Sequence, residues 1–285
     1  MRVAVTGASG FTGRYLMRAL GAHGMEPAAL NADVTDRGAL RAELEMIKPA
    51  AVVHLAAKAF VNSDDFESFY SVNQTGTFNL LKAIDEVCPD ASVLLASSAQ
   101  VYGSAAGLLS EEQPLAPANH YALSKAAMEM GAGFWSERLR IIVARPFNYT
   151  GVGQETRYLV PKIVDHFARR APVIELGNID VQRDIGDVRG VTDAYCGLLA
   201  AGQPGTFNIS TEELVSVRDI IDMATDITGH RIDVRVNPAF VRSNDVPVLG
   251  GSNAKLRQCV GNWKPVPIAK TLAWMLAQPA MPEGH

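Results

Sequence analysis

The pattern of hydrophobic and polar positions alternates, in the first half of the chain, between short apolar runs and longer amphipathic stretches. Four of the apolar runs read as strands, at residues 3–5, 51–55, 92–96 and 140–144. Strands separated by helical segments are typical of a parallel sheet that helices cover on both faces. The pattern therefore predicts a doubly wound α/β fold.

After residue 150 the pattern changes, since prolines and turn signals become denser and the apolar runs become shorter. We expect residues 1–150 to form the main domain and residues 151–285 to form most of a smaller α/β part. Parts added to a cofactor-binding core commonly carry substrate specificity.

Composition and charge narrow the choice of partner. The 285 residues are 48% hydrophobic and 20% charged, and 30 acidic residues slightly outnumber 26 basic ones. Without a cationic run, a nucleic-acid or anionic-membrane partner is disfavoured, and a small-molecule partner is favoured.

The first strand begins at Val3, without room for a signal peptide, and no apolar stretch is long enough to span a bilayer, so we expect a cytoplasmic protein. The three cysteines lack metal-ligand spacing, which argues against a metal site.

Three glycines follow the first predicted strand directly. Gly7, Gly10 and Gly13 open the next helical segment, which is the arrangement that a dinucleotide pyrophosphate needs, because the backbone turns sharply and helix N–H groups face the anion. We find no acidic residue after the second strand that would bind a ribose 2′-hydroxyl, and no clear arginine for a 2′-phosphate. The choice between NAD(H) and NADP(H) stays open.

Tyr121 and Lys125 lie four residues apart in a helical segment, so that both side chains share one face. Reduction of a ketone needs a proton donor, and a neighbouring ammonium favours the phenolate of a tyrosine. Ser98 follows the strand at residues 92–96, at the edge of the sheet where ligands bind. We expect Ser98 to polarise a carbonyl group, Tyr121 to protonate it and Lys125 to lower the pKa of the tyrosine. Ser97 is expected to be structural.

Several motifs resemble those of one superfamily. The segments TGASGFTG, HLAA, SSAQVYG, YALSK and RPFN occur in the order found in extended short-chain dehydrogenases that modify nucleotide sugars. The later segments NIDVQRDIGDVRGVTDAY, VNPAFVRSNDVPVLGGSNAKL and GNWKP are similar to those of GDP-mannose 4,6-dehydratases and, more closely, GDP-4-keto-6-deoxy-D-mannose reductases.

The resemblance implies a Rossmann-type core, to which residues 184–210 return, a smaller C-terminal substrate domain, and a homodimer. It implies NAD(H) or NADP(H) as cofactor, contacted by Gly7, Ser9, Gly10, Phe11, Thr12, Gly13, Asp33, Val34, Leu55, Ala56, Ala57, Asn73, Tyr121, Lys125 and Pro146. It implies that the nucleotide sugar contacts Gln100, Asn148, Lys162, Arg183, Arg242 and Asp245. In this assignment the two arginines grip the diphosphate and Asp245 faces the guanine.

Gln100 departs from the resembling dehydratases, in which a glutamate at this position removes the C5 proton of the sugar. A carboxamide cannot serve as that base. We therefore expect reduction of the 4-keto group of GDP-4-keto-6-deoxy-D-mannose to GDP-D-rhamnose, without dehydration. The alternatives are a reductase that forms GDP-6-deoxytalose, a 4-epimerase or 4-ketoreductase of a UDP-, CDP- or dTDP-sugar, and a regulator that binds cofactor without turnover.

Overall fold

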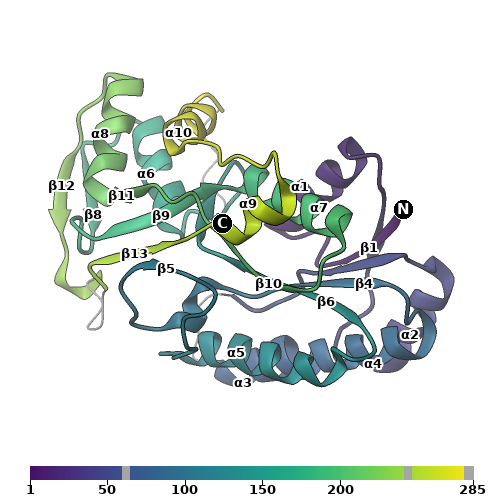
Figure 1. Ribbon diagram of the computed structural model, residues 1–285. Helices are drawn as coiled ribbons and strands as arrows, with labels where there is room; N and C mark the ends of the chain where they lie inside the picture. The colour runs from purple at the N-terminus through teal and green to yellow at the C-terminus, as the bar shows by residue number, and fades with distance from the viewer. Residues whose placement is uncertain (60–64, 241–245, 279–285) are drawn as a thin grey trace.

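The computed structural model describes residues 1–59, 65–240 and 246–278, and its main feature is a six-stranded parallel sheet (Figure 1). The strand order is β10-β6-β4-β3-β1-β2. The strands are β1 (Arg2–Thr6), β2 (Glu26–Leu30), β3 (Ala51–His54), β4 (Ser92–Ala96), β6 (Arg140–Pro146) and β10 (Gly205–Ile209). The predicted doubly wound, Rossmann-type sheet is confirmed.

The strands that the pattern predicted are those buried on both faces. In β3 all four residues are buried, and in β4 the first four are. The edge strand β2 differs, because it contains Pro27 and its first four residues are only partly buried or exposed. Proline is tolerated at an edge, where one side of the strand has no neighbour.

Helices cover both faces of the sheet (Figure 1). One core contains Val3, Leu16 and Val191 and lies under α1 (Phe11–Ala22) and α7 (Val188–Ala201), with α9 (Ala254–Val260) beside α7. The other face packs against α2 (Arg37–Ile47), α4 (Thr77–Val87) and α5 (His120–Ala132). The short helices α3 (Phe66–Ser68) and η1 (Phe69–Gly76) precede α4, and η2 (Ala99–Tyr102) follows β4.

A second sheet has the order β11-β9-β13-β5, and β7 pairs with β9. Its strands are β5 (Gly107–Leu109), β7 (Asn148–Thr150), β9 (Gln182–Asp187), β11 (Leu214–Ser216) and β13 (Val248–Gly251). A third core joins α6 (Leu159–Ala168), α8 (Val217–Thr228) and α10 (Ile268–Leu276), beside the paired strands β8 (Val173–Leu176) and β12 (Asp233–Val236).

The two halves of the chain exchange strands. β10, from the later half of the chain, pairs with β6 in the large sheet. β5, from the first 150 residues, pairs with β13 in the second sheet. The division into domains at residue 150 stays a prediction. Over the described ranges, none of the helices has the length and apolar character needed to cross a membrane.

Candidate active site

The turn between β1 and α1 is built from backbone alone. Gly7 has a φ of 67°, and a Cβ there would lie 2.8 Å from the backbone nitrogen of Ala56. A Cβ on Gly13 would lie 2.1 Å from the Gly7 carbonyl oxygen. Gly10 precedes the first turn of α1, where no side chain caps the helix N–H groups. The turn therefore fits a dinucleotide pyrophosphate, which binds to such free N–H groups.

Buried polar contacts hold the HLAA segment beneath this turn. The Thr6 hydroxyl accepts hydrogen bonds from the backbone N–H groups of Leu55 and Ala56, each 3.1 Å long. His54 bridges Thr6 and Thr77 through its two ring nitrogens, at 2.7 and 2.9 Å. Burial lowers the pKa of His54 to about 3, so the ring is neutral and serves as a structural bridge.

Tyr149 adds a contact to the glycine turn that sequence reasoning missed. Its ring stacks on Phe11 with 6.3 Å between centroids, and its hydroxyl lies 2.8 Å from that of Thr12. Arg14 binds the carbonyl oxygen of Ser9 at 3.1 Å. β7 therefore packs directly against the predicted cofactor-binding turn.

The predicted adenine side lies beyond β2. The Asp33 carboxylate accepts hydrogen bonds from the N–H and hydroxyl groups of Thr35, both at 2.8 Å, while Val34 is buried against the helices. These hydrogen bonds lower the pKa of Asp33. Asp33 is therefore an exposed, ionised group at neutral pH.

The structure brings Ser98, Tyr121 and Lys125 together. Ser98 follows β4 and forms a hydrogen bond with Tyr121. Tyr121 is 8% exposed, and Lys125, one turn later on α5, is 3% exposed and donates to the Ala96 carbonyl oxygen at 2.7 Å. All three groups thus lie at the carboxyl end of β4, the edge where ligands of doubly wound sheets bind.

Burial dominates the protonation of this cluster. It raises the pKa of the Tyr121 phenol well above its ordinary value, and the hydrogen bond with Ser98 offsets only part of that rise. Burial also lowers the pKa of Lys125 to about 8, while the Glu129 carboxylate raises it. Tyr121 is therefore neutral at physiological pH and holds a proton that it can donate. The predicted lowering of its pKa by Lys125 stays a prediction.

Asn73 supports the cluster through its neighbours. Its amide group accepts from the Lys58 N–H at 2.8 Å and donates to the Lys58 carbonyl oxygen at 2.9 Å. It also donates to the Ser124 hydroxyl at 3.0 Å, and that hydroxyl donates to the Tyr121 carbonyl oxygen. Asn73 therefore links the loop after β3 to the first turns of α5.

A buried ion pair lies one turn beyond Lys125, and sequence reasoning missed it. Glu129 receives three hydrogen bonds of 2.6 to 3.1 Å from Arg145, and the two side chains are 6% and 7% exposed. Ser97 also donates to Glu129, while Arg145 donates to the Tyr102 hydroxyl at 2.9 Å. Glu129 thus ties α5 to the ends of β4 and β6, and Ser97 has the structural role expected for it.

Gln100 is half-buried and close to the start of α5. Its amide oxygen accepts a hydrogen bond of 3.2 Å from Asn119, whose own amide oxygen caps α5 through the Ala122 N–H. With its oxygen engaged, Gln100 keeps N–H groups to offer to a ligand.

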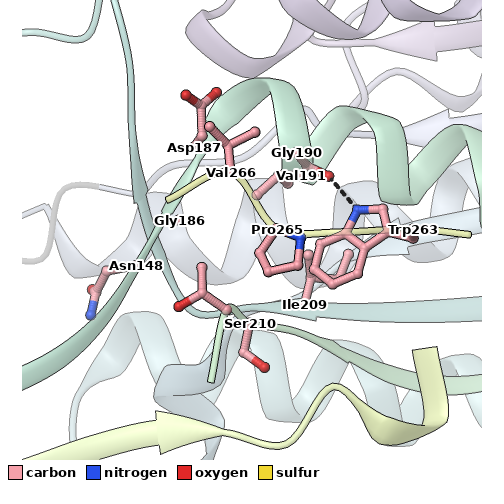
Figure 2. Close-up of a pocket in the computed structure, with 11 residues that line it drawn as sticks. Asn148, Gly186, Asp187, Gly190, Val191, Ile209, Ser210, Trp263, Pro265 and Val266 are labelled. Carbon is pink, nitrogen blue, oxygen red and sulfur yellow. Dashed lines mark hydrogen bonds between the residues drawn. The ribbon is translucent and has the colours of Figure 1, made fainter. Parts of the chain in front are cut away.

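The remaining predicted substrate residues are dispersed. Asn148 lies in a small cleft with Gly186 and Trp263, whose indole N–H donates to the Gly190 carbonyl oxygen (Figure 2). Its amide donates to the Asp184 carbonyl oxygen at 3.5 Å.

Lys162 donates to the Glu175 carbonyl oxygen at 2.7 Å and lies over the Phe240 ring. Arg183 donates to the Val246 carbonyl oxygen at 2.6 Å. Pro146 ends β6, opposite Ile209 of β10. Arg242 and Asp245 lie outside the described residues.

Among the residues that the structure describes, no group of three or more His, Cys, Asp or Glu side chains is placed to hold a metal ion.

The parallel sheet, the glycine turn and the Ser–Tyr–Lys cluster define an NAD(P)-dependent oxidoreductase of the extended short-chain dehydrogenase class. The family model for GDP-mannose 4,6 dehydratase matches residues 27–273. The chain therefore belongs to the GDP-mannose 4,6-dehydratase family.

Two related proteins and one solved structure match this chain over nearly its whole length. GDP-6-deoxy-D-talose 4-dehydrogenase of Aggregatibacter actinomycetemcomitans is 37% identical over 92% of this chain and 92% of that protein. GDP-6-deoxy-D-mannose reductase of Pseudomonas aeruginosa is 34% identical over 93% of this chain and 92% of that protein. The structure of RMD from Pseudomonas aeruginosa complexed with NADPH has 32% identity and a TM-score of 0.89, and covers 97% of each chain.

Proposed function

We propose that this protein reduces the 4-keto group of GDP-4-keto-6-deoxy-D-mannose to form GDP-D-rhamnose, with NADH or NADPH as reductant. The observation that carries the proposal is the contact between the half-buried Ser98 and the buried Tyr121, with Lys125 one turn away on the same helix as Tyr121. The related GDP-6-deoxy-D-mannose reductase supports the choice of sugar.

Each side chain has one task in this reaction. A dihydronicotinamide dinucleotide held at the turn of Gly7, Gly10 and Gly13 would supply the hydride for the carbonyl carbon of the sugar. Ser98 donates a hydrogen bond to the carbonyl oxygen, and Tyr121 transfers its phenolic proton to the oxygen as negative charge develops there. Lys125, held by the Ala96 carbonyl oxygen, presents an ammonium group that stabilises the phenolate left behind.

The direct test mixes the purified protein with GDP-4-keto-6-deoxy-D-mannose and either NADH or NADPH. We expect oxidation of the dinucleotide, followed by its absorbance, and GDP-D-rhamnose as the product identified by NMR. Absence of oxidation under conditions in which a related reductase is active would overturn the proposal.

A second outcome at C4 has its own support, because the relative at 37% identity is a GDP-6-deoxy-D-talose 4-dehydrogenase. The two products differ in the sugar face that meets the dinucleotide. The same NMR experiment separates them, since the C4 proton of the 6-deoxytalose product has a different coupling pattern. A GDP-6-deoxytalose product would retain the catalytic roles of Ser98 and Tyr121 and change only the assigned stereochemistry.

The guanosine assignment is tested separately from turnover. A ligand that binds only the folded state raises its apparent stability. We expect GDP to raise the melting temperature more than UDP, CDP or dTDP does, and a larger effect of a pyrimidine nucleotide would overturn the assignment.

We also propose that the protein forms a homodimer through α5. Leu123, Met130 and Phe134 are 45%, 71% and 85% exposed, and their spacing places them along one side of α5 and the turn after it. An exposed apolar stripe of this kind is typical of an interface. Light scattering should give twice the mass of the chain, and Phe134→Glu should yield monomers; a monomeric wild type would contradict the proposal.

A further inference from the structure

A carboxylate occupies the carboxyl end of β2, where the strand itself ends on the apolar residue Leu30. Glu43 of α2 reaches back to this point and accepts a hydrogen bond from the N–H of Asn31 with each of its oxygens, at 3.0 Å. It also accepts one from the N–H of Ala32 at 2.7 Å. Three hydrogen bonds therefore fix a negative charge at the end of the second strand.

The end of the second strand is where doubly wound dinucleotide-binding sheets receive the adenine ribose. A 2′-phosphate at this place is held by backbone N–H groups and cations, and it carries a charge of about −1.5 to −2. In this protein the N–H groups of Asn31 and Ala32 are already paired with Glu43. The same carboxylate that occupies those donors would also repel a phosphate.

Neighbouring charges strengthen this repulsion. Residues 31–45 contain four carboxylates and two arginines. Of the arginines, Arg41 forms an ion pair with Glu45, and Arg37 is an exposed side chain at the first position of α2. Asp33 adds an exposed carboxylate whose pKa is lowered by its hydrogen bonds to Thr35. The segment as a whole is therefore anionic.

We propose that Glu43 makes this protein select NAD(H) over NADP(H). The inference rests on the use of a nicotinamide dinucleotide by this fold and concerns only the choice between the two forms. One unit charge against a 2′-phosphate a few ångströms away in a water-like medium changes affinity by about tenfold. A ribose 2′-hydroxyl carries no charge and escapes this penalty.

The test titrates the full-length protein with NADH and with NADPH, and follows the fluorescence of the dihydronicotinamide to obtain two dissociation constants. We expect NADH to bind about tenfold more tightly than NADPH. Glu43→Gln should remove most of this difference by improving NADPH binding. Glu45→Gln is the matched control, because it removes the same charge from the same helix at an exposed position that pairs with Arg41.

Two results would overturn the inference. One is NADPH binding as tight as NADH binding in the wild type, and the other is an equal effect of the Glu43 and Glu45 variants. If Glu43→Gln unfolds, the two dissociation constants of the wild type are measured at increasing salt concentration instead. Salt screens the repulsion of the 2′-phosphate, so the difference in affinity between NADH and NADPH should become smaller, and an unchanged difference would overturn the inference. Binding of neither form would overturn the proposed function itself.

Discussion

Replacing Lys125 with methionine is expected to stabilise the folded protein at pH 7 while abolishing most of its activity. Lys125 is 3% exposed, and its pKa falls from the ordinary 10.5 to about 8, because burial disfavours the ammonium form. Glu129 offsets this effect only in part. Methionine keeps an unbranched side chain of similar length without the charge, so it avoids the penalty.

The size of the effect follows from the shift in pKa. A tenfold change in proton affinity is worth about 1.4 kcal/mol, so the fall to about 8 corresponds to a penalty of about 3 kcal/mol for the folded state. The variant also loses the hydrogen bond to the Ala96 carbonyl oxygen, which costs about 1 kcal/mol. The expected net stabilisation at pH 7 is about 2 kcal/mol.

The difference in stability between wild type and Lys125→Met should depend on pH, which provides a second test. Between about pH 8 and 10.5 the unfolded chain binds more protons at Lys125 than the folded chain does, so the stability contributed by this residue rises with pH. Below that window the penalty is complete, and above it the penalty is absent. The advantage of the methionine variant should therefore shrink as the pH rises from 8.

Urea denaturation at pH 7, 8 and 9.5 measures this advantage from the midpoints, provided that the slopes agree. Lys82→Met is the matched control, because Lys82 is 43% exposed and pairs with Glu86 at the surface. Activity should fall at least about 100-fold in Lys125→Met. A variant that is less stable than wild type at pH 7, or an advantage that does not change with pH, would refute the reasoning.

Three further changes test other parts of the site. Tyr121→Phe should lower the rate of ketone reduction at least about 100-fold while NADH binding, followed by fluorescence, persists; an unchanged rate would remove the proton donor. Glu129→Ala should lower the free energy of unfolding by about 3 to 5 kcal/mol in urea, because it leaves the buried Arg145 unpaired, and a loss under about 1 kcal/mol would contradict this. Gly13→Ala should cost about 1 to 3 kcal/mol and weaken NADH binding, since its Cβ would overlap a carbonyl of the glycine turn, whereas Gly21→Ala on the same helix meets no atom within 4 Å and should bind NADH normally.

The sequence predicted the buried part of the fold well, because strands covered on both faces must be apolar along their length. Residues 51–55 and 92–96 were recognisable for that reason. β2 was harder to delimit, since an edge strand tolerates Pro27 and needs fewer apolar side chains. The pairing of β5 with β13 joins residues about 140 positions apart. No local pattern carries that information.

In the candidate site, too, residues marked by local sequence features could be predicted, whereas residues that depend on distant partners could not. Ser98, Tyr121 and Lys125 could be proposed from sequence because a strand end and a four-residue helical spacing are local features, and the structure brings these residues together. Their catalytic roles stay a prediction. Glu43 and Glu129 were missed because each acts through a partner that is distant in sequence or on the backbone. A carboxylate that binds backbone N–H groups from a neighbouring helix leaves no motif in the sequence.

α5 combines the stabilising and destabilising parts of this site. Lys125 lowers the stability of the fold, since a buried ammonium is kept where the reaction needs it. One turn later Glu129 binds Arg145 and Ser97, and so attaches the helix to the two strands that flank the reacting groups. Because a buried pair is costly to break but adds little net stability, its main contribution is to fix geometry. The ion pair therefore holds in place a lysine that the apolar interior alone would exclude.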